Sequence, residues 1–95
     1  MIRIGNIELG DCPLIMAPME DITDSPFRAI CRMYGADLLI SEFISSEGLI
    51  RDAGKSIQKM TFEESERPVG IQIFGHDEES LRKATEIAAS RNPDF

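Results

Sequence analysis

The stretch that most constrains the fold is residues 14–28, where a short apolar run leads through a turn into the start of a helix. Residues 14–16 are apolar without alternation, which is typical of a strand covered on both faces. Pro18 has no backbone N–H, so we expect the strand to end there. Pro26 suits the first turn of a helix and follows three possible capping residues, Thr23, Asp24 and Ser25. Ligands of α/β folds bind at the carboxyl ends of parallel strands, and residues 17–20 would lie at such an end.

The rest of the chain alternates strand-like and helix-like segments. We expect strands at residues 14–16, 38–43 and 69–74, and helices at residues 25–34, 47–52 and 78–91. Residues 2–9 alternate around Gly5-Asn6 and predict a β-hairpin, while residues 54–67 predict a long connector with a short extended piece near residues 60–62. This βαβ spacing is typical of a parallel sheet, so the predicted class is α/β.

The helices carry apolar stripes and terminal signals. In the first helix the stripe is expected to face the sheet, and its residues are Phe27, Ile30, Cys31 and Tyr34. In the last helix the stripe comprises Leu81, Ala84, Thr85 and Ala88, joined by Ile87, and Asp77 is the expected N-cap. Asp24 and Arg28 are spaced for an ion pair within one helix.

Composition excludes several classes of protein. The 95 residues have 42% apolar and 28% charged residues, and no apolar run reaches the roughly 18 residues that span a bilayer. No signal peptide begins at Met1, so we expect a cytoplasmic protein. Cys12 and Cys31 are too few and too far apart for a disulfide scaffold or a metal site, which predicts reduced, buried thiols. The net charge of −7 argues against this segment being the part that binds a polyphosphate.

Two positions are candidates for cofactor binding. Ala17-Pro18-Met19 could form a backbone shelf under a flat cofactor, although residue types alone favour a plain strand end. Gln72 lies within an apolar strand, where an unsatisfied amide costs about 1–3 kcal/mol. Its donor and acceptor would suit the pyrimidine edge of a flavin, or could be satisfied by a neighbouring strand or water.

Other polar residues have simpler interpretations. Glu42 ends the second strand and is either a site carboxylate or, more commonly, a solvated strand-end acid. Asp21 and Asp24 are interpreted as a turn former and a helix cap, and His76 as an exposed loop residue.

Five segments together resemble one known family, the tRNA-dihydrouridine synthases, which are FMN-dependent TIM-barrel enzymes. The segments are Ala17-Pro18-Met19, Ile22-Thr23-Asp24, Pro26-Phe27-Arg28, Ser41-Glu42-Phe43 and Gln72-Ile73-Phe74-Gly75. The resemblance implies the first three β/α units of a (β/α)8 TIM barrel, preceded by an N-terminal β-hairpin that crosses the barrel bottom. Such a barrel takes about 250 residues, so residues 1–95 are expected to be the N-terminal, incomplete part of a single catalytic domain.

The resemblance also implies a function and a site. It places FMN beside Ala17, Pro18 and Met19, with Gln72 in contact with the cofactor, NADPH as reductant and a uridine of tRNA as substrate. The family's catalytic cysteine is expected beyond Phe95, and neither cysteine of this chain matches its motif. The tRNA would be bound by parts outside this chain, which alone should bind FMN weakly and could self-associate.

Two alternatives remain open at this point. The chain could belong to another FMN-dependent TIM-barrel oxidoreductase, such as a dihydroorotate- or ene-reductase type. It could also be a non-enzymatic small α/β binding module.

Overall fold

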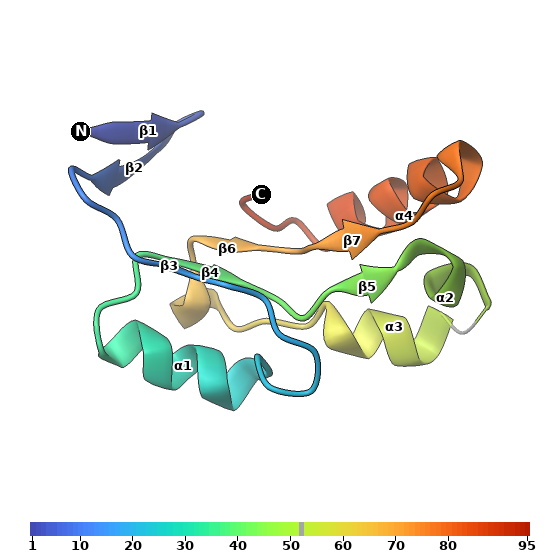
Figure 1. Cartoon of the computed structure of the whole chain (residues 1–95), viewed down its shortest axis with the longest axis horizontal. Coiled ribbons are helices and arrows are strands. Elements are labelled where there is room, and N and C mark those ends of the chain that lie inside the picture. The colour runs from blue at the N-terminus through green and yellow to red at the C-terminus, as the bar shows by residue number, and fades with distance from the viewer. Residues whose placement is uncertain (52) are drawn as a thin grey trace.

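The computed structural model describes residues 1–51 and 53–95. Strands β1 (Ile2–Ile4) and β2 (Ile7–Gly10) form an antiparallel hairpin, which confirms the predicted turn at Gly5-Asn6. Gly5 has a φ of 58°, a left-handed conformation that glycine adopts without steric cost. In Figure 1 the hairpin lies at the N-terminal end of the molecule, apart from the helices.

The remaining strands are short and parallel. Strands β3 (Ile15–Met16), β4 (Leu38–Ile40) and β6 (Val69–Gly70) form one sheet in the order β3-β4-β6, and β5 (Ile44–Ser45) pairs with β7 (Ile73–Phe74). The predicted strand at residues 69–74 is therefore divided into two pieces, β6 and β7. The strand predicted at residues 38–43 is confirmed only at residues 38–40, because residues 41–43 are not a strand and β5 begins at Ile44.

The helices lie on both sides of these strands. They are α1 (Ser25–Met33), α2 (Ser46–Arg51), α3 (Ala53–Lys59) and α4 (Glu78–Ser90), with a 3-10 turn, η1, at Glu64–Glu66. Figure 1 shows α1 and α3 on one side of the strands and α4 on the other. Asp24 caps α1 by accepting a hydrogen bond from the Phe27 amide at 3.0 Å. Asp77 caps α4 in the same way, from the Ser80 amide at 2.8 Å. Both caps are as predicted.

The predicted connector at residues 54–67 is wrong, because most of its first half is α3 and η1 lies near its end. Ile57 and Met60 account for the helix, since both pack into the core from this segment. The extended piece predicted at residues 60–62 is not a strand either. The predicted helix at residues 47–52 matches α2, except that Asp52 lies outside the described residues.

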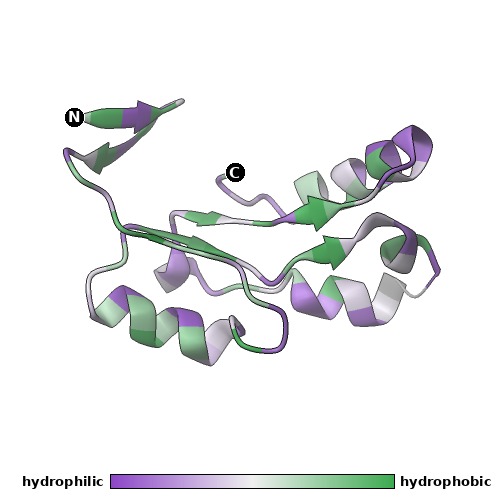
Figure 2. Cartoon of the chain, in the orientation of Figure 1, coloured by the Kyte–Doolittle hydropathy of each residue, from purple (hydrophilic) through white to green (hydrophobic). Residues whose placement is uncertain are grey.

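The main core forms where β5, α2, the end of α3 and α4 meet. Its buried residues are Ile44, Leu49, Met60, Ala84 and Ala88. Figure 2 shows the apolar strands between helices of mixed hydropathy. The α4 stripe is confirmed at Ala84 and Ala88, whereas Thr85 is exposed.

Three burial predictions are wrong. In β3 and before it, Ile15 is 52% and Leu14 61% exposed, because β3 is an edge strand. In α1 the apolar stripe is only partly covered: Phe27 and Cys31 are half-buried, whereas Ile30 and Tyr34 are exposed. The one buried residue of this helix is Arg28. Cys12 is exposed, although both cysteines are free thiols as predicted.

The end of the chain runs beside β6. The Asp94 amide donates to the Val69 carbonyl oxygen at 2.9 Å, and the Ile71 amide donates to that of Phe95 at 3.2 Å. These bonds hold the last two residues alongside β6. Within the described residues, no helix has the length and hydropathy needed to cross a membrane.

Candidate cofactor site

A hollow of about 340 Å³ brings together two of the four residues predicted to bind a cofactor, Pro18 and Gln72. Pro18 follows β3, and Gln72 lies between β6 and β7. The other lining residues are Leu38, Ile40, Gly70, Ile71 and Phe95. Strands β3, β4 and β6 lie side by side, and this places residues distant in sequence around one hollow.

The chemistry of the hollow is mainly apolar, with one amide. Leu38 and Ile40 are alternate residues of β4, so they project to the same face of the sheet. The Gln72 side chain is exposed and has no hydrogen-bond partner within the described residues. Its backbone oxygen, in contrast, accepts a bond from the Ile44 amide at 2.9 Å. The hollow therefore offers a ligand a mainly apolar lining with one free amide.

Ala17 and Met19 flank Pro18 in the chain but do not line this hollow. Both are exposed. The Met19 carbonyl oxygen accepts backbone bonds from Ile22 at 3.1 Å and Thr23 at 3.0 Å, and forms the turn between β3 and α1. Asp21 adopts a φ of 61° in this turn, in agreement with its interpretation as a turn former.

Glu42 is not a solvated strand-end acid. Its side chain is 8% exposed and lines a separate hollow of about 220 Å³, together with Arg28, Lys59 and other polar residues. His76 is exposed in the loop before α4, as predicted, at 3.8 Å from a carboxylate oxygen of Glu47.

Sequence reasoning missed a buried polar network beside the site. The expected pairing of Arg28 with Asp24 is wrong, because Arg28 forms an ion pair with Glu66. Their side chains are only 2% and 1% exposed. The i, i+4 rule considers local partners alone, and Glu66 lies 38 positions further along the chain. The only hint in the sequence was the arginine itself, because the fold buries position 28 of α1 and a buried guanidinium needs a charged partner.

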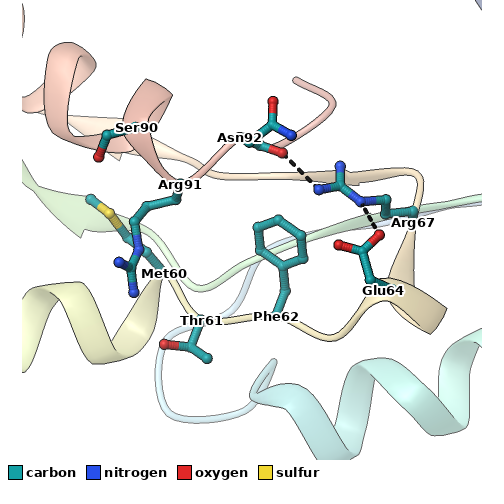
Figure 3. A pocket seen from close by; sticks show the side chains of 8 residues that line it. All are labelled: Met60, Thr61, Phe62, Glu64, Arg67, Ser90, Arg91 and Asn92. Carbon is teal, nitrogen blue, oxygen red and sulfur yellow. Dashed lines mark hydrogen bonds and ion pairs between the residues drawn. The ribbon is translucent and has the colours of Figure 1, made fainter.

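A further hollow, of about 340 Å³, is lined by residues from the α3–β6 connection and the end of α4 (Figure 3). The Arg67 guanidinium donates to Glu64 at 2.8 Å and to the Asn92 carbonyl oxygen at 2.9 Å. The hydrogen bond to Glu64 and the charge of Asp94 raise the pKa of Arg67, against a smaller lowering by burial. None of the four predicted cofactor residues lies in this hollow.

Comparisons with known proteins assign the chain to a family. The sequence model of the dihydrouridine synthase family matches residues 15–94. A probable tRNA-dihydrouridine synthase of Aquifex aeolicus is 41% identical over 91 residues, which are 95% of this chain and 28% of that protein. The tRNA-dihydrouridine synthase B of Vibrio vulnificus is 37% identical over 92% of this chain and 27% of its own length. That of Shewanella oneidensis is 40% identical over 90% of this chain and 26% of its own length.

The chain thus spans about a quarter of the length of the curated relatives it matches. The family match covers the β3–α1 turn, all the parallel strands and Gln72, and so includes the whole hollow except Phe95. The chain belongs to the dihydrouridine synthase family.

Proposed function

We propose that the protein containing this chain is an FMN-dependent tRNA-dihydrouridine synthase, which reduces uridine in tRNA to dihydrouridine with NADPH as the reductant. The observation that carries the proposal is the family match over residues 15–94, joined by relatives named for this activity. The hollow at Pro18 and Gln72 supports it, because its lining suits a flavin ring. The other flavin oxidoreductases considered from the sequence have no comparable support.

In this proposal, residues 1–95 are the N-terminal part of a single TIM-barrel domain and contribute its first three β/α units. The strand order β3-β4-β6 supports it, since consecutive parallel strands of a barrel lie side by side. The hairpin of β1 and β2 would cross the end of the barrel away from the site.

Four residues would hold the cofactor. Ala17, Pro18 and Met19 would lie along the flavin ring, and the Gln72 amide would bond its pyrimidine edge. When bound, reduced FMN supplies the hydride that uridine accepts. The uridine must leave its base stack to reach the flavin.

Two tasks fall to residues outside this chain. Neither Cys12, before β3, nor Cys31, on α1, lines the hollow, so neither is placed to protonate the substrate. The net charge of −7 likewise assigns the main tRNA contacts to other parts of the protein.

The test is a visible absorption spectrum of the protein as its gene encodes it, purified from its own host without added cofactor. We expect a flavin spectrum that bleaches with NADPH and returns when unmodified tRNA is added. Bleaching without a response to tRNA would instead indicate another flavin oxidoreductase. A folded protein that takes up no FMN would contradict the proposal.

A Gln72→Ala substitution tests the site itself. The loss of hydrogen bonds to the flavin should weaken FMN binding about tenfold, as judged by fluorescence titration. Gln58→Ala is the matched control, because Gln58 is also an exposed amide but lines a different hollow. Equal FMN affinity for Gln72→Ala and the control would remove Gln72 from the site.

A further inference from the structure

We infer that Thr23, Arg28 and Glu66 form a buried polar brace that positions the β3–α1 turn, residues 17–23, against the flavin. The inference rests on the proposed function, which places Met19 along the ring. It assigns these three residues a positioning role, because none of them lines the hollow at Pro18 and Gln72. The brace consists of three sets of hydrogen bonds, and all of them join residues that the structure describes.

The first step fixes Met19. The Thr23 hydroxyl accepts a hydrogen bond from the Met19 amide at 3.0 Å and donates one to the Met19 carbonyl oxygen, also at 3.0 Å. Thr23 is fully buried. One side chain therefore bonds both backbone polar groups of Met19, in addition to the backbone bonds that the Met19 carbonyl oxygen accepts from the Ile22 and Thr23 amides, and its loss would leave the Met19 amide without this partner.

The second step fixes Thr23. Arg28 donates from Nη1 to the Thr23 carbonyl oxygen at 2.8 Å and from Nη2 to the Thr61 carbonyl oxygen at 3.0 Å. Its Nε donates to Glu66. All three nitrogens of the guanidinium thus donate hydrogen bonds, and the planar geometry of the group fixes the directions of these bonds.

The third step ties the turn to the segment that leads into β6. The Glu66 carboxylate accepts hydrogen bonds from the Glu63 amide at 2.7 Å and the Ser25 hydroxyl at 2.8 Å, besides that from Arg28. Glu66 lies three residues before Val69, where β6 begins, and the same segment continues to Gln72. The brace therefore joins the two chain segments that carry Pro18 and Gln72.

A buried ion pair gains little stability over an apolar pair of the same size, but breaking it is costly. Its distinctive property is directional bonding to several fixed partners. Because one of its bonds ends on the Thr23 carbonyl oxygen and the others end on Ser25, Thr61 and Glu63, the pair fixes the end of the cofactor-binding turn relative to the segment before β6.

The test measures FMN affinity in the protein as its gene encodes it. Thr23→Val keeps the shape of the side chain and removes both side-chain bonds to Met19 while the backbone bonds remain, so the Kd for FMN should rise about tenfold. Thr23→Ser keeps the hydroxyl and should restore an affinity within about twofold of the original. The absorption band of the bound flavin should shift only in Thr23→Val.

Arg28→Lys and Arg32→Lys form a second pair. Arg32 also lies on α1 and donates to the carbonyl oxygens of Ala36, Glu66 and Pro68, but to none in the turn. We expect Arg28→Lys to weaken FMN binding clearly more than Arg32→Lys, because only Arg28 bonds the turn itself, even where both lower the melting temperature. If Arg28→Lys does not fold, the two Thr23 variants decide.

An unchanged Kd and flavin spectrum in Thr23→Val, with only a lower melting temperature, would overturn the inference. So would equal losses of affinity in Arg28→Lys and Arg32→Lys. In both cases FMN binding by the original protein would leave the proposed function intact, whereas failure of the original protein to bind FMN would refute the proposed function.

Discussion

At the scale of single residues, Gly75 shows how closely two elements approach. It follows β7, and a Cβ atom built on it would lie 2.1 Å from the Ser46 hydroxyl oxygen and 3.3 Å from the Leu81 side chain. Ser46 is fully buried and bonded to the Ser80 hydroxyl at 3.2 Å. Only a residue without a side chain lets α2 begin this close to the end of β7.

We therefore predict that Gly75→Ala destabilises the protein by about 1–3 kcal/mol. To make room, Ser46 must rotate and lose its bond to Ser80. The measurement is the midpoint of urea unfolding, compared with that of Gly48→Ala. At Gly48, within α2, an added Cβ would meet Ser45 at an ordinary 3.4 Å, so alanine should stabilise by up to about 1 kcal/mol. Equal midpoints for the two variants would contradict the steric argument.

Residue roles were predictable where the partner is near in sequence. Asp24 and Asp77 were identified as helix caps because a cap bonds an amide three residues away. The pairing of Arg28 was not predictable, since nothing in a local pattern distinguishes Glu66 from other acidic residues of its segment. Long-range polar pairs become visible only when the fold is known.

At the scale of elements, α4 is the most regular helix and carries a local charge network. Arg82 bonds Glu79 at 2.6 Å and Glu86 at 2.6 Å. The hydrogen bond from Arg82, and then its charge, hold the pKa of the Glu79 carboxyl below its ordinary value of 4.5. A carboxyl with a lowered pKa stabilises the fold above its ordinary pKa, and this contribution is lost as the pH falls through the lowered value.

Glu79→Gln should therefore slightly lower the melting temperature at about pH 7, and this loss should shrink at acidic pH, as the carboxyl becomes protonated. Glu78→Gln is the control, because Glu78 lies in the same first turn of α4 and has no ion pair among the described residues. The difference between the two variants isolates the pairing with Arg82. A difference that is the same at both pH values would rule out this electrostatic origin.

The elements themselves were predictable where periodicity and caps agree, as in α1, α4 and the hairpin. The error at α3 has a physical cause, since Gly54 and the charged residues that follow weaken the helical signal. Burial of Ile57 and Met60 outweighs that weak propensity. The α1 stripe misled for the opposite reason: its apolar residues are periodic, but no described element covers Tyr34.

At the scale of the whole molecule, the sequence predicted that Pro18 and Gln72 belong to the same site, and both line one hollow. Pro18 was predicted at the carboxyl end of one parallel strand and Gln72 within another, and the strand order β3-β4-β6 brings the two residues to one hollow. The sequence could not show that Pro18, rather than Ala17 or Met19, lines the hollow. The conformation of the turn decides which of these three successive residues faces it. Burial around the sheet was least predictable, since it depends on what covers each face.

The exposed faces lead to a prediction about the chain of residues 1–95 on its own. The outer edge of β3 has no partner strand within the described residues, and Leu14 and Ile15 beside it are largely exposed. An uncovered strand edge with apolar side chains is a template for pairing with another chain. We expect the isolated chain to self-associate as its concentration rises, as measured by light scattering during size-exclusion chromatography.

A charge at this edge should reverse the effect. Ile15→Lys places an ammonium group on β3 and should shift the chain towards monomer, because pairing with a second edge would desolvate that charge. Ile50→Lys is the matched control, since Ile50 is also exposed but lies on α2, away from the sheet edge. If both lysine variants reduce association equally, general apolar exposure is the cause and the edge has no special role. If the original chain stays monomeric at every concentration, its sheet edge is protected by something other than a neighbouring strand.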